Sequence, residues 1–76
     1  MLTAEQIKAA RALLSWGQRE LAEASGLSLP TIKRVEAARG TIRSTPATIM
    51  AIRKALEAEG IEFIRNGVVG VTCRRS

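Results

Sequence analysis

A sharp corner between two short helical segments constrains this chain more than any other feature. Residues 21–35 read LAEASGLSLPTIKRV, with hydrophobic residues at helical spacing on both sides of Gly26. Glycine permits the left-handed backbone that ends a helix and turns the chain within one residue. Leu27 then points back into the core. The pattern predicts two short helices that cross each other with very little chain between them.

The segment after the corner is predicted to be a helix with a buried stripe and a free face. Ser28 is a good N-cap, and Pro30 is tolerated in a first turn because its missing N–H would have no helical partner there. Helical spacing places Ile32, Val35 and Glu36 inward, and Leu29, Pro30, Lys33, Arg34 and Ala37 outward. The corner therefore leaves a basic outer face free to enter a groove.

Capping signals predict three further helices. Thr3 and Gln6 have the form of a capping box, Gly17 is an acceptable cap, and Thr45-Pro46 puts proline at a first helical position. These helices are predicted to begin at Ala4, Gln18 and Pro46 and to end near Leu14, Ser25 and Gly60.

The pattern changes after Gly60. The segments IEFIR and VVGVTC are rich in β-branched and apolar residues, and Asn66-Gly67 between them is the strongest short hairpin signal. We therefore predict a mainly α chain, with a four-to-five-helix bundle in residues 1–59 and a C-terminal β-hairpin in residues 60–76.

The hairpin is also the predicted dimerisation element. A two-residue turn would pair Ile64 with Val69, and Phe63 with Gly70. Its apolar residues occupy both faces, so one face is expected to lie on the last helix and the other, with an open strand edge, on a second copy of the chain. The expected interface residues are Phe63, Ile64, Val69 and Val71. In the alternative, the hairpin folds only onto its own bundle.

The charge distribution points to a polyanionic partner. The chain has 12 Lys and Arg residues against 7 acidic residues. Four of the basic residues lie in one stretch, opposed there only by Glu36, and they are Lys33, Arg34, Arg39 and Arg43. This clustering favours nucleic acid as the partner.

The composition argues against catalysis and metal binding. The chain has no His, Asp or Tyr, so general acid–base chemistry would fall to scattered Glu or Lys residues. A single cysteine, Cys73, cannot supply a metal site or an internal disulfide. No apolar run approaches the roughly 20 residues of a membrane span. We expect a cytoplasmic protein that is not an enzyme, is not in a membrane and uses no cofactor.

The residues of the corner resemble a known family. Ala22, Gly26, Leu27, Ile32 and Val35 stand where a helix-turn-helix places its small, glycine and apolar positions. The run from Ile7 to about Leu56 resembles the phage-repressor (Cro/Xre-type) DNA-binding domain. The resemblance implies a DNA-binding transcription regulator in which the helix after Gly26 is the recognition helix.

The resemblance also implies roles for residues outside that helix. Members of this family pair an Arg late in the first helix with a Glu late in the recognition helix, and Arg11 and Glu36 occupy the matching positions. We interpret this pair as structural, because an inward Glu needs a partner to stay charged. Gln18 resembles the family's Gln at the start of the second helix, which contacts a DNA phosphate. A helix N-terminus favours that role.

The recognition helix departs from the family at its first turn. Where the family often has polar base-reading residues, this chain has Leu29 and Pro30, which could pack on a thymine methyl group. Polar base readout is then expected from Arg34 and Lys33, with a phosphate contact as the alternative for each. The expected phosphate contacts are Gln18, Thr31, Arg39, Thr41 and Arg43.

Three hypotheses for the function follow. The first is a sequence-specific regulator of double-stranded DNA, a repressor that acts as a homodimer on a palindromic operator. The second is an antitoxin-type regulator whose C-terminal tail binds a protein partner. The third is a protein-interaction module with an incidental basic face. Salt-dependent DNA binding separates the first two from the third, and a co-purifying partner separates the second from the first.

Overall fold

The computed structural model describes residues 2–38, 44–64 and 70–73, and within them it contains four helices and two strands. The predicted helix starts are confirmed, as is the mainly α class. The elements are α1 (Ala4–Leu14), α2 (Gln18–Ser25), α3 (Leu29–Glu36), α4 (Pro46–Glu57), β1 (Ile61–Ile64) and β2 (Gly70–Cys73).

Local capping explains where the helices start and stop. The Thr3 hydroxyl accepts from the Gln6 N–H at 3.2 Å, and the Gln6 side chain accepts from the Thr3 N–H at 2.9 Å, which completes the capping box. At its other end, α1 stops at Ser15, whose φ of 57° is left-handed. The helix therefore ends at Leu14, as predicted. The last helix ends earlier than predicted, with Glu57 rather than at Gly60.

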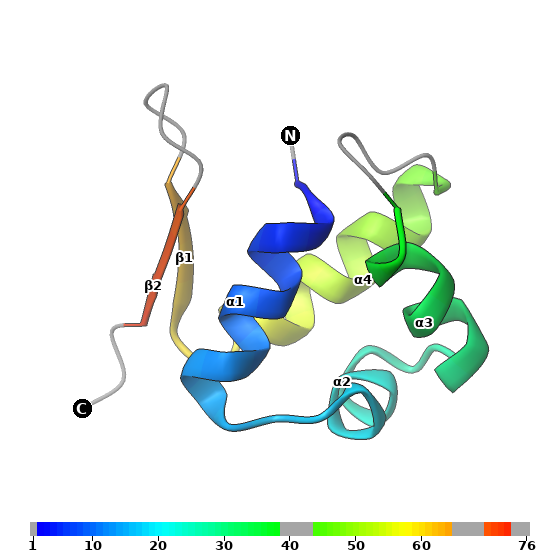
Figure 1. Cartoon of the computed structure of the whole chain (residues 1–76), viewed down its shortest axis with the longest axis horizontal. Coiled ribbons are helices and arrows are strands. Elements are labelled where there is room, and N and C mark those ends of the chain that lie inside the picture. Colours follow the sequence, from blue (N-terminus) through cyan, green and yellow to red (C-terminus); the bar gives the residue numbers. More distant parts are fainter. Residues whose placement is uncertain (1, 39–43, 65–69, 74–76) are drawn as a thin grey trace.

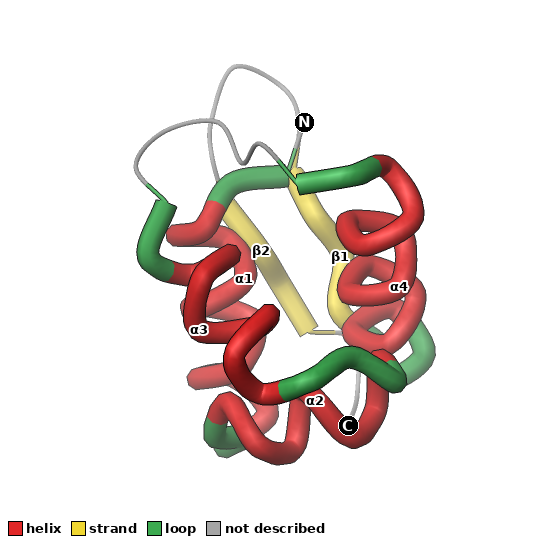
Figure 2. The backbone as a smooth tube through the Cα atoms, turned by 90° about the vertical axis from the view of Figure 1, so that its right-hand side faces the viewer, coloured by secondary structure: helices red, strands yellow, loops and turns green. Residues whose placement is uncertain are grey.

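The hydrophobic core is built from one or two large side chains of each helix. The largest fully buried residues are Ile7, Leu21, Ile32, Val35, Ile52 and Leu56. Ile61 of β1 joins this core, and Trp16 packs against it while remaining partly exposed. The core therefore ties α2 and α3 to α1 and α4, and in Figure 2 the four helices lie in front of the two strands.

The two strands form an antiparallel hairpin beside α1. Strand β2 packs along α1, and β1 contacts α4. In Figure 1 the hairpin lies on one side of α1 and the α2–α3 pair on the other. The Arg53 guanidinium of α4 lies 5.7 Å from the centre of the Phe63 ring, which adds a link between helix and strand. The hairpin is thus an integral part of the bundle.

The predicted hairpin register is wrong by one residue. Ile64 pairs with Gly70 and Phe63 with Val71, whereas a two-residue turn would have paired them with Val69 and Gly70. The physical reason lies in the burial of one face of β1. Ile61 is buried and Glu62 is exposed. The observed register pairs Ile61 with Cys73 and Glu62 with Thr72, so apolar residues face apolar ones and polar residues face polar ones.

Among the residues that the structure describes, no helix combines the length and the hydropathy that crossing a bilayer requires.

Candidate nucleic-acid interface

The corner between α2 and α3 is formed by a left-handed glycine. Gly26 has a φ of +75°, and its N–H donates to the Glu23 carbonyl oxygen at 3.4 Å. The Leu27 N–H then donates to the Ala22 carbonyl oxygen at 3.1 Å, which closes the end of α2. Ser28 starts α3 by accepting the Thr31 N–H at 3.3 Å. Only two residues, Leu27 and Ser28, therefore separate Gly26 from the first residue of α3.

Helix α3 has the two faces that its spacing predicts. Ile32, Val35 and Glu36 are buried, while Pro30, Lys33, Arg34 and Ala37 are exposed. Leu29 differs from the prediction. It was expected on the outer face but is half-buried, so only part of its side chain is available to a ligand.

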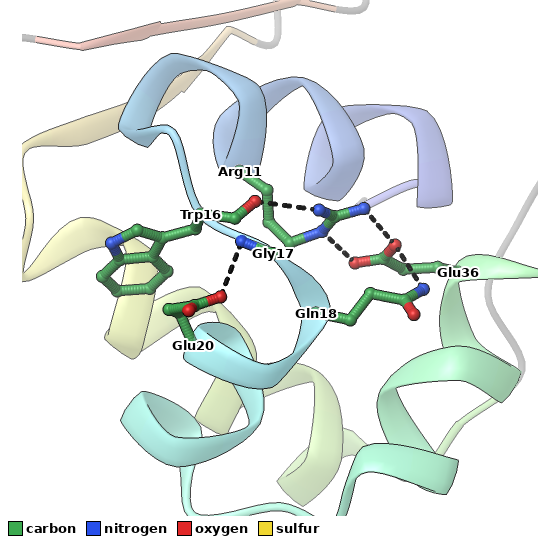
Figure 3. Close-up of polar contacts among 6 residues, drawn as sticks. All are labelled: Arg11, Trp16, Gly17, Gln18, Glu20 and Glu36. Carbon is green, nitrogen blue, oxygen red and sulfur yellow. Dashed lines mark hydrogen bonds and ion pairs between the residues drawn. The ribbon is translucent and has the colours of Figure 1, made fainter.

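A hydrogen-bonded network fixes the buried end of α3. The Glu36 carboxylate, with 2% of its side chain exposed, accepts Arg11 Nε at 2.6 Å and Arg11 Nη2 at 2.7 Å. Arg11 also donates through Nη1 to the Trp16 carbonyl oxygen at 3.0 Å. Figure 3 shows this arrangement. A bidentate contact of this kind strengthens the ion pair and also fixes the relative orientation of the two side chains.

Gln18 completes this network. Its Nε2 donates to Glu36 Oε1 at 3.1 Å, so the side chain points toward Glu36 (Figure 3). The contact between Gln18 and a DNA phosphate that the family resemblance implies stays a prediction. Glu36 thus accepts donors from α1 and from α2, and the position of α3 relative to both is held by one buried carboxylate.

Glu20 has a role that the sequence analysis missed. One of its carboxylate oxygens accepts the Gly17 N–H at 2.8 Å, and a Cβ atom on Gly17 would approach that same oxygen to 2.8 Å. The signal was present in the sequence, because Glu20 is the third residue of a helix that Gly17 caps. This carboxylate takes up one donor near the start of α2.

The other predicted DNA-contacting residues fall into two groups. Thr31 is half-buried, and its hydroxyl lies 2.8 Å from the Ser28 hydroxyl. Arg39, Thr41 and Arg43 lie outside the described residues. The structure therefore brings Pro30, Lys33 and Arg34 together on one exposed helical face. Over the described part of the chain, no cluster of His, Cys, Asp or Glu residues could hold a metal ion.

The predicted dimer-interface residues of the hairpin differ in how far the structure describes them. Phe63 is half-buried against the core of its own chain. Val69 lies outside the described residues, and only the backbone pairing of Ile64 and Val71 is described.

Comparison with known proteins agrees with this arrangement. A family model described as helix-turn-helix matches residues 7–63. The match begins at Ile7 in α1, includes the whole of α2, α3 and α4, and ends at Phe63 in β1. Among curated proteins, no match to the chain was found. The matched segment covers well over half of the sequence and contains the Gly26 corner. The chain therefore belongs to the helix-turn-helix family of Cro/Xre-type DNA-binding transcription regulators.

Proposed function

We propose that this protein binds a specific double-stranded DNA sequence through the exposed face of α3 and represses transcription as a homodimer on a palindromic operator. One observation carries the proposal. Pro30, Lys33 and Arg34 are exposed on a helix whose opposite face is buried and held by the Glu36 network. A fixed helix with a basic free face suits insertion into the major groove.

Base recognition falls mainly on the second turn of α3. The Arg34 guanidinium can donate two hydrogen bonds at once to O6 and N7 of guanine, which makes Arg the commonest specific contact to that base. Lys33 can donate to the same acceptors through its ammonium group, without the bidentate geometry of Arg. Pro30 and the exposed part of Leu29 add apolar contacts at the first turn.

Phosphate contacts orient the helix in the groove. We assign them to Thr31, Arg39, Thr41 and Arg43, together with the start of α2. The Gln18 amide already donates one hydrogen to Glu36. A phosphate contact from Gln18 would therefore use its backbone N–H or the second amide hydrogen.

Dimerisation would use the hairpin. The exposed residues Glu62 and Thr72 are polar, so the open edge of the sheet and the predicted interface residue Ile64 are the better contacts. The hairpin lies on the side of α1 opposite the α2–α3 pair, which keeps α3 free (Figure 1). Two recognition helices that bind successive turns of DNA are about 34 Å apart. Each chain is 29 Å along its longest axis, so two chains joined through the hairpin are large enough to span that distance.

Selection of bound sequences from a random DNA pool tests the proposal. We expect enrichment of a palindrome whose half-sites are about 10 base pairs apart from centre to centre. We also expect affinity to fall steeply as salt is raised, because basic residues that contact phosphates release counterions. A pool that shows no enrichment after repeated rounds would contradict sequence-specific binding.

A further inference from the structure

The first turn of α3 offers few hydrogen-bond donors to an approaching ligand. Pro30 has no backbone N–H, and the Thr31 N–H already donates to the Ser28 hydroxyl oxygen at 3.3 Å. The Ser28 and Thr31 hydroxyls are bonded to each other at 2.8 Å, so the pair keeps one hydroxyl hydrogen for an outside acceptor. A helix N-terminus usually binds phosphate through its free N–H groups. Most of that capacity is absent here.

The same turn exposes hydrocarbon to solvent beside a basic surface. Pro30 is exposed and Leu29 is half-buried, and one turn later Lys33 and Arg34 are exposed. The two cations would draw this surface onto DNA. In the major groove, the edge of every base pair carries donors or acceptors, and thymine alone among the unmodified bases adds a C5-methyl group. A turn that is apolar and poor in donors matches this methyl group better than any polar base edge.

We infer that the first turn of α3 reads the C5-methyl group of pyrimidines, with Pro30 as the main contact and the exposed part of Leu29 beside it. The inference rests on the proposed function, because it concerns the same face of α3. A contact made through carbon alone depends on the methyl group and not on the polar groups of the ring. The turn therefore accepts 5-methylcytosine as well as thymine, and methylation of a cytosine at the contacted position strengthens binding.

Base analogues test the methyl contact directly. In the selected DNA site, each thymine is replaced singly by deoxyuridine, which removes only the methyl group. We expect affinity to fall about fourfold per contacted methyl, the value that corresponds to the burial of one such carbon group. At the same positions, 5-methylcytosine is expected to bind about fourfold more tightly than cytosine.

Two variants assign the effect to Pro30. Pro30→Ala keeps a residue that suits the first turn of a helix but removes the ring, so the fourfold difference between thymine and deoxyuridine is expected to shrink to the smaller part that Leu29 contributes. Lys33→Ala is the matched control on the same face. It is expected to weaken binding to both DNAs while their ratio stays unchanged. Thermal melting by circular dichroism verifies that both variants fold.

The possible results separate this inference from the proposed function. Specific binding with equal affinity for thymine and deoxyuridine at every position would overturn the inference and leave the proposed function standing. A methyl effect of undiminished size in Pro30→Ala would also overturn it, because the main contact would then lie elsewhere. A failure to bind any DNA sequence preferentially would overturn the proposed function, and the inference with it.

Discussion

The buried carboxylate of Glu36 is the residue on which the geometry of the interface depends most. It accepts two hydrogen bonds from Arg11 and one from Gln18, so it joins α1, α2 and α3. Burying a charge is costly unless a partner compensates it. Because Glu36 lies on α3 two residues after the exposed Arg34, the same contact that neutralises Glu36 also helps to fix the angle of the recognition face.

Removing this carboxylate is expected to destabilise the fold strongly. Glu36→Ala leaves Arg11 without its partner, and we expect the free energy of unfolding to fall by about 3–5 kcal/mol. Glu57→Ala is a control, because Glu57 forms a surface ion pair with Arg53 at 3.0 Å and its side chain is 44% exposed. That change should cost about 0–1 kcal/mol. Denaturant unfolding measures both, and equal losses would contradict the structural role of Glu36.

The end of α1 shows how one residue terminates an element. Ser15 adopts a left-handed backbone, and the N–H groups of Ser15 and Trp16 donate to carbonyl oxygens of the last turn. A non-glycine residue in that conformation stores about 1–2 kcal/mol of strain. Replacing Ser15 with a residue that tolerates this backbone conformation should relieve part of the strain.

Ser15→Gly is expected to stabilise the protein by about 0.5–1 kcal/mol, since glycine relieves the strain but gains entropy in the unfolded chain. Ala12→Gly is the matched control. Ala12 is exposed in the interior of α1, where the same replacement should cost about 1 kcal/mol. A loss of stability in both variants, measured by thermal melting, would show that Ser15 is not strained.

The helices could be predicted from sequence because their signals are local. The caps formed by Thr3, Ser28 and Thr45 lie within three residues of the groups that they bond, so spacing alone identifies them. The register of the hairpin could not be predicted in this way. It depends on the burial of Ile61 against the bundle, a contact that brings together residues far apart in the sequence.

The candidate site shows the same division. The inner and outer faces of α3 follow from helical spacing and were predicted. The direction of the Gln18 side chain depends on Glu36, 18 residues away, and the phosphate contact that the family resemblance implies stays a prediction. The half-buried position of Leu29 likewise depends on packing between elements. Spacing within one segment cannot reveal either of them.

At the scale of the whole molecule, the hairpin is expected to join two chains. We predict that light scattering at micromolar concentration gives the mass of a dimer, and that Ile64→Lys shifts it toward the monomer by placing a charge in the interface. Ala12→Lys adds the same charge at an exposed position of α1 and is expected to leave the dimer intact. A monomeric mass for the unchanged chain would contradict this prediction. A stable complex with a different protein would favour the antitoxin-type alternative.

The central claim is that the exposed face of α3 reads DNA bases. Its most direct test compares the affinities of Arg34→Ala for the selected site and for random DNA, with Lys54→Ala, a change at an exposed position of α4, as the control. We expect Arg34→Ala to cost about 1–3 kcal/mol on the selected site and to relax preference at one base position, while random DNA is affected little. Arg43→Ala should weaken binding to both DNAs alike, and Lys54→Ala should change neither affinity substantially. An equal loss of affinity for selected and random DNA in Arg34→Ala would contradict base reading by α3.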